Sequence, residues 1–122
     1  MNKTITLTLS LLIATTFASP VVLAEKTAIQ KMAQIVSQLN HRPSAGDKEI
    51  LREIGKKGTE AEKTIAKALM MMDHKVAAED KEKLHLIAKD RNVPENTREL
   101  ANIVQNLNHQ ASSNEQTILK NM

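Results

Sequence analysis

The chain contains one sequence pattern three times, and this repetition constrains the fold more than any other feature. The copies begin at Met32, Ile65 and Leu100. In each copy an amphipathic stretch ends in Asn or Asp followed by His, and a short polar break then leads to a second amphipathic stretch. Periods of about 20 to 50 residues are typical of repeat proteins, in which each unit buries its apolar face only against a neighbouring unit. The sequence therefore predicts three similar structural units.

The hydrophobic pattern inside each copy is helical. Apolar residues recur at spacings of three and four, which places them on one face of an α-helix, and no segment competes with the alternation of a strand. Ser or Thr followed three residues later by Asp or Glu is a capping box, which predicts helix starts at Ser44, Thr59 and Ser112. Pro94 suits the first turn of a further helix. We expect an all-α fold of about six helices in three tandem hairpins, packed as a short curved stack or as a compact bundle.

Residues 1–24 have the features of an export signal. Lys3 is followed by an apolar stretch over residues 5–17, and Ala24 offers a small residue at the cleavage position. Cleavage there leaves one all-α domain at 25–122, with repeats at about 27–58, 59–91 and 92–122. We therefore expect a periplasmic or secreted bacterial protein that is not stably inserted in the membrane after the signal is removed.

The composition of the mature chain argues against several classes of function. Removing Lys3 from the 17 Lys and Arg residues leaves 16, against 14 Asp and Glu, so the mature chain is nearly balanced in charge. The single aromatic residue, Phe17, lies in the signal, so bases and sugars have no ring to stack on. We therefore expect no nucleic-acid partner. The chain has no Cys, and it lacks G-x-S-x-G, P-loop and H-E-x-x-H motifs, so we expect neither enzymatic activity nor a cofactor.

The histidines His41, His74 and His109 occupy the same place in each repeat and allow two interpretations. As helix-ending residues they would bond the free carbonyls and complement the negative end of the helix dipole. As metal ligands they would form one shared centre. Equivalent positions in stacked helices are about 8 to 10 Å apart, whereas zinc needs each ligand nitrogen at about 2.0 to 2.1 Å. This spacing favours the helix-ending role, with the Asn or Asp before each His in the left-handed conformation. A shared centre requires a closed bundle with converging helix ends.

Two methionines interrupt the repeat. Met70 and Met71 align with residues that are polar in the other copies, whereas Met72 aligns with Leu39 and is expected in the core. The pattern predicts two flexible apolar side chains on the surface, which is typical of a contact site for a partner. An alternative is copper binding by Met70, Met71 and His74, because residues three and four apart share one helix face and thioether with imidazole suits Cu(I).

The expected function is binding of another macromolecule, a protein or peptide of the cell envelope. The predicted surface consists of Met70, Met71 and the three histidines His41, His74 and His109. An adaptor, a chaperone and an immunity-type inhibitor are equally compatible with it, and the sequence determines neither the partner nor the oligomeric state. The alternative is a periplasmic copper- or zinc-binding protein that uses His and Met.

Overall fold

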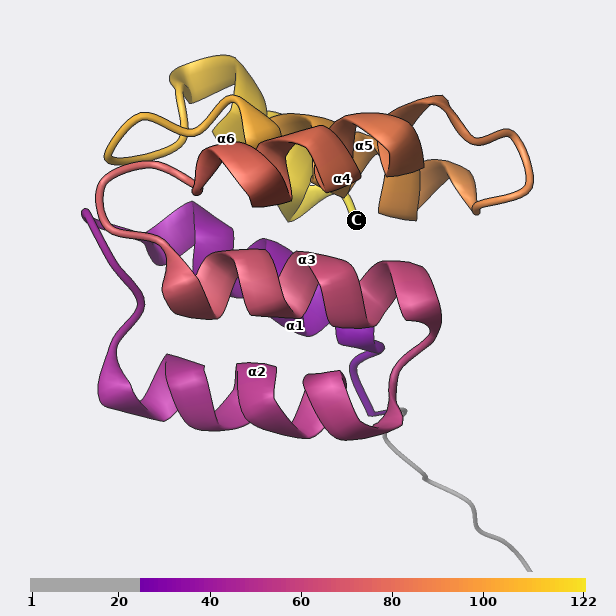
Figure 1. Ribbon diagram of the computed structural model, residues 1–122. Helices are drawn as coiled ribbons and strands as arrows, with labels where there is room; N and C mark the ends of the chain where they lie inside the picture. The colour runs from indigo at the N-terminus through magenta and orange to yellow at the C-terminus, as the bar shows by residue number, and fades with distance from the viewer. Residues whose placement is uncertain (1–24) are drawn as a thin grey trace, which may run out of the picture.

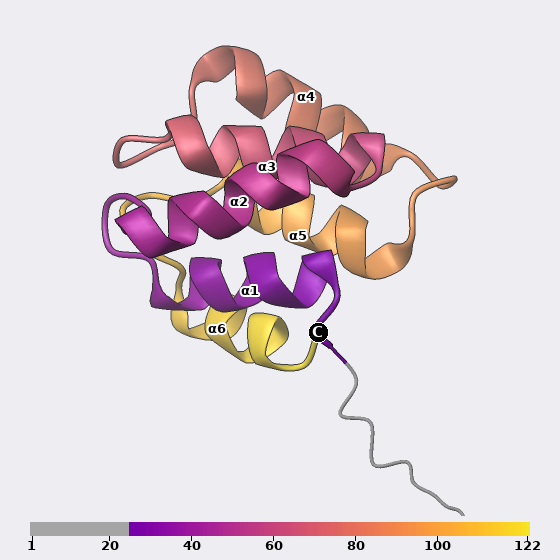
Figure 2. The same cartoon turned by 90° about the horizontal axis from the view of Figure 1, so that it is seen from below.

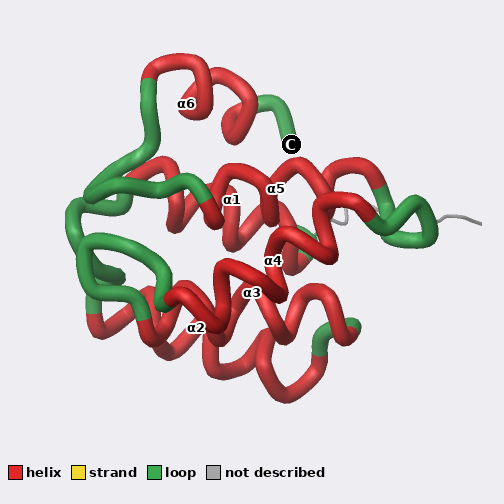
Figure 3. Tube along the Cα trace, turned by 45° about the horizontal axis from the view of Figure 1, so that its top comes forward, coloured by secondary structure: helices red, strands yellow, loops and turns green. Residues whose placement is uncertain are grey.

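The computed structural model describes residues 25–122, which form six α-helices and no strand beyond isolated bridges. This confirms the predicted all-α class (Figure 3). The predicted export signal, residues 1–24, lies outside the described residues. The helices are α1 (Ala28–Gln38), α2 (Ala45–Lys57), α3 (Glu60–Met71), α4 (Ala78–Lys89), α5 (Glu95–Gln105) and α6 (Ser113–Lys120).

The helix starts follow the capping chemistry that the sequence predicts. Ser44, Thr59 and Ser112 each accept a hydrogen bond from the backbone N–H three residues later, and the acidic residue there bonds back to the cap N–H. A fourth box at Thr27, completed by Gln30, begins α1. These reciprocal bonds satisfy backbone donors that a helix start leaves unpaired. Helix α5 begins at Glu95. Pro94, which was expected in the first turn, is therefore the N-cap of this helix.

The helices close into a compact bundle rather than extending as an open stack. Helices α1, α3 and α5 contact one another at the centre, and α6 returns to pack against α1 (Figures 1 and 2). Two side-chain hydrogen bonds support this closure, because Gln116 Nε2 donates to Ser37 O at 2.7 Å and Gln30 Nε2 donates to Met122 O at 3.4 Å. The first and last units of the chain are therefore neighbours.

The closest helix pairs differ from the predicted hairpins. The most extensive contacts join α2 to α3, α4 to α5 and α6 to α1, so the second helix of each unit packs against the first helix of the next. Only Gly58 and Thr59 separate α2 from α3. Such a short link makes consecutive helices antiparallel neighbours. By contrast, six residues, 39–44, separate α1 from α2 within the first unit.

The core is aliphatic, and equivalent residues of the three units build it. The outer helices contribute Leu51, Leu84 and Leu119, all buried. Burying one such side chain contributes about 1.5 to 3 kcal/mol. The central helices contribute the buried set Val36, Leu69 and Val104. Among residues 25–122, no helix has the length and apolar character needed to cross a bilayer.

Candidate metal centre

Each central helix leads into the same turn, and a histidine occupies its most constrained position. His41, His74 and His109 have φ values of 73, 68 and 70°. No other residue in the described part of the chain has a positive φ. The expectation that the preceding Asn or Asp would adopt this left-handed conformation is therefore wrong, because the histidines adopt it instead. For a residue with a Cβ this conformation costs about 1 to 2 kcal/mol.

A closed ring of backbone hydrogen bonds joins the three turns. The N–H of His41 donates to the carbonyl of His109 at 2.8 Å, that of His74 to His41 at 2.9 Å, and that of His109 to His74 at 2.8 Å. Each unit thus supplies one donor and one acceptor. A protein hydrogen bond contributes about 0.5 to 1.5 kcal/mol net, so the ring offsets much of the cost of the left-handed turns.

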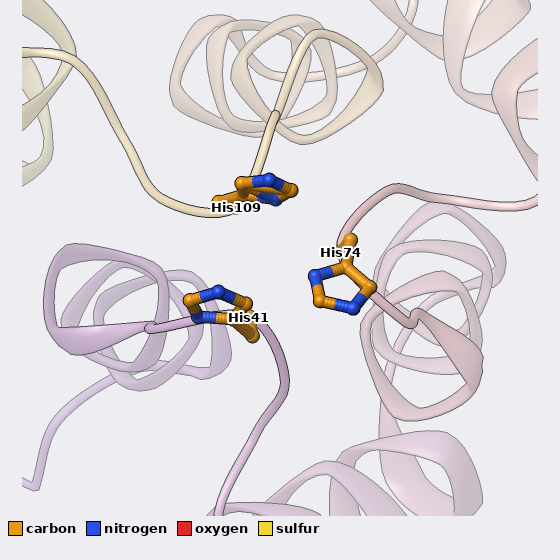
Figure 4. Close-up of side chains that lie close together, drawn as sticks. All are labelled: His41, His74 and His109. Carbon is orange, nitrogen blue, oxygen red and sulfur yellow. The ribbon is translucent and has the colours of Figure 1, made fainter.

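The ring brings the three imidazoles together (Figure 4). Their centroids are 4.8 to 4.9 Å apart, with the His41 and His109 rings stacked and His74 edge-on to both. One nitrogen of each ring lies within 4.8 Å of the others. The separation of 8 to 10 Å expected for these positions is therefore wrong. The units are arranged around a common axis, so their equivalent residues meet near that axis.

These nitrogens are close enough for one metal ion, provided that the rings rotate so that their lone pairs face it. Three atoms within 4.8 Å of one another have a common point no more than about 2.8 Å from each (4.8 Å divided by √3). An imidazole nitrogen binds zinc at about 2.0 to 2.1 Å, so each has to move inward by roughly 0.7 Å or less. His74 has a side chain that is 46% exposed. A ring in contact with solvent has the freedom to make such a movement.

The electrostatics of the turn favour a cation. Helices α1, α3 and α5 all end at this cluster, at Gln38, Met71 and Gln105. Each helix C-terminus carries the equivalent of about half a negative charge. Three helix ends with this partial negative charge therefore lie within four residues of the histidines in sequence.

Two features of the rings bear on metal coordination. Asn40 Oδ1 lies 2.5 Å from His41 Nδ1. The amide oxygen only accepts, so Nδ1 carries the hydrogen of neutral His41 and Nε2 keeps a free lone pair. The pKa of His109 lies below its ordinary value because burial disfavours the charged ring, and because His41, His74 and Lys75 add positive potential. Neutral imidazole is the form that coordinates metals.

Charged side chains lie on the rim of the cluster. Arg42 donates to Asp73 Oδ1 at 3.0 Å, which links the first and second units. The same oxygen lies 3.6 Å from His74 Nε2. The sequence prediction did not single out Arg42, and it assigned Asp73 only a structural role as the residue before a repeated histidine. His85, the fourth histidine, is exposed on α4.

The methionines only partly match the prediction. Met71 is 66% exposed, as expected, and Met72 is buried in the core at 4%. Met70 instead is half-buried and packs against the core, so the prediction that it faces solvent is wrong. Helix α3 contacts α1, α2, α4 and α5. The aligned residues Ser37 and Gln105 are half-buried as well, so this position is partly covered in all three units.

Of the predicted site residues, the structure brings together one histidine from each of the three units, whereas Met70 and Met71 both lie on α3. No protein-family model matches this chain, and no curated protein or solved structure is significantly similar to it.

Proposed function

We propose that this protein binds a transition-metal ion, zinc or copper, through His41, His74 and His109. The observation that carries the proposal is the meeting of the three rings, one from each repeat, with ligand atoms within 4.8 Å of one another. Imidazole is a suitable ligand for both metals. With the export signal proposed for residues 1–24, the protein is a metal-binding protein of the bacterial periplasm or a secreted one.

The identity of the residue in the turn supports a role for the side chain. Gly or Asn adopts the left-handed conformation most easily, and the hydrogen-bonded ring uses only backbone atoms. The backbone hydrogen bonds of the turn therefore do not require imidazole. The chain nevertheless has His at this position in all three units, each directly after an Asn or Asp. Metal coordination accounts for this choice, because it requires the side chain that the turn does not.

Zinc titration with a calorimetric readout tests the proposal. The wild-type protein is expected to bind about one zinc per chain, since each chain has one cluster of this kind among residues 25–122. His74→Asn is expected to abolish this binding, because two imidazoles remain. His85→Asn is the matched control, since it removes an exposed histidine from α4 and should leave binding unchanged. Equal binding by wild type and His74→Asn would refute the site.

A second candidate function is binding of an envelope protein or peptide at the end of α3. It is supported by the 66% exposure of Met71, an apolar and flexible side chain. Met71→Glu should leave the melting temperature nearly unchanged and abolish capture of the partner from a periplasmic extract. Capture that is unaffected by this substitution would exclude Met71 from any such surface.

A further inference from the structure

The metal-binding proposal leaves a specific question about the remaining coordination positions. Three protein ligands do not complete the tetrahedral shell of zinc, and zinc sites with three protein ligands hold a water or substrate in the fourth position. His74 and His109 are exposed, so a solute can reach a metal held between the rings. The charges around the cluster then determine which solute binds there.

The ligand set and its rim are positive when a metal is bound. The three ligands are neutral imidazoles, so a divalent ion keeps its full charge. Lys75 directly follows His74, and its carbonyl accepts a hydrogen bond from the Asp73 N–H at 3.3 Å, so Lys75 belongs to the tight turn that carries this ligand. Arg42 follows His41, and its guanidinium pairs with Asp73, whose carboxylate is balanced by this contact. Counting Arg42, Asp73 and Lys75, the rim adds one net positive charge.

We propose that the metal-loaded cluster binds a small anion at its open coordination position, with Lys75 and Arg42 strengthening the binding. This inference rests on the proposed metal site. The anion class includes free inorganic anions and carboxylates, because both offer a negative donor atom to the metal and accept hydrogen bonds from the two basic side chains.

Cobalt provides the test, because Co²⁺ accepts the same ligands as zinc and its visible absorption reports its coordination shell. The full chain without its signal is loaded with Co²⁺ and titrated with azide, followed by acetate as a carboxylate probe. We expect a saturable change of the cobalt bands in azide. Lys75→Gln and Arg42→Gln should each weaken azide binding by about two- to fivefold, the range expected for one exposed charge. Lys89→Gln, which removes an exposed lysine at the end of α4, is the control and should not change azide binding.

The outcomes separate this inference from the proposed function. Absence of histidine-dependent cobalt bands would refute the metal site itself. Cobalt binding without any response to azide would refute only the anion position. If Asp73→Asn then restored the response, Asp73 would be the fourth ligand, a result that also overturns the inference. An azide response that is equal in wild type, Lys75→Gln and Arg42→Gln would overturn the role of the rim. Competition of acetate with azide would extend the binding to carboxylates, including those of a partner protein.

Discussion

Replacing His74 by Gly should separate the stability of the turn from metal binding. His74 has a φ of 68°, which costs a residue with a Cβ about 1 to 2 kcal/mol and costs Gly nothing. Gly also loses more conformational entropy on folding, which is worth about 0.5 to 1 kcal/mol. The side chain of His74 is 46% exposed, so little packing is lost. The relief of backbone strain and the loss of conformational entropy nearly cancel or favour Gly. The free energy of unfolding of His74→Gly should therefore equal that of wild type or be about 1 kcal/mol higher.

The matched variant is His74→Ala. It removes the same ring but keeps a Cβ in the left-handed conformation, so it should be less stable than His74→Gly by about 1 kcal/mol. Both variants retain the N–H and carbonyl that bond to His41 and His109. Both should therefore keep the bundle and differ only in backbone strain.

The assay is urea unfolding, first with a chelator and then with zinc. In wild type, zinc at 100 times its dissociation constant should add about 2.7 kcal/mol to the free energy of unfolding. In His74→Gly this increment should be lost. A fall of 2 kcal/mol or more for His74→Gly in the presence of chelator would refute the reasoning, because it would show that the imidazole itself stabilises the fold.

Three further predictions concern the helix ends, the glycines and the pH dependence. Ala77 occupies the position that is Ser44 or Ser112 in the other units, and α4 lacks a side-chain cap. Ala77→Ser should therefore raise the free energy of unfolding by about 0.5 to 2 kcal/mol in urea titrations. The control Ala78→Ser should not raise it. A Cβ on Gly55 meets nothing within 4 Å, so Gly55→Ala should stabilise α2 by about 0.5 to 1 kcal/mol. A Cβ on Gly58 would lie 2.8 Å from Ile54 O, so Gly58→Ala should destabilise the protein by about 1 to 3 kcal/mol; equal melting temperatures for the two variants would contradict this. The pKa of His109 is lowered in the folded protein, so the unfolded chain binds a proton at this histidine at a higher pH than the folded protein does. The stability of the metal-free protein should therefore fall as pH drops through about 6.5 and level off below the folded pKa of His109. Proton NMR should show the His109 pKa rising in a His41→Ala, His74→Ala double variant.

The helices and their starts could be predicted from the sequence because they depend on local chemistry. The capping pairs at Ser44, Thr59 and Ser112 act over three residues, and each was confirmed. The burial of the leucines could also be predicted, because it follows from the helical spacing of apolar residues within one segment. By contrast, the close pairs α2–α3 and α6–α1 depend on link lengths and on closure of the chain ends, which hydrophobic periodicity does not report.

The meeting of the histidines was considered but disfavoured for the same reason. A distance of 8 to 10 Å between equivalent positions holds for units that follow one another along a line. In a closed arrangement, equivalent residues near the axis approach one another from all sides, as His41, His74 and His109 do. The available signal was the presence of three copies with identical turns, since three such units are able to close into a ring.

The core also bears on the kind of metal site that the three histidines are proposed to form. Small zinc domains need the metal to fold, because their binding energy is also their folding energy. Here the buried aliphatic cluster includes residues of all six helices, and a domain of about 100 residues buries enough surface to fold without a metal. The histidines lie outside that cluster, in exposed turns held by backbone bonds. At the proposed site, metal would therefore enter and leave without unfolding the bundle, which is the property required of a reversible carrier rather than of a structural zinc site.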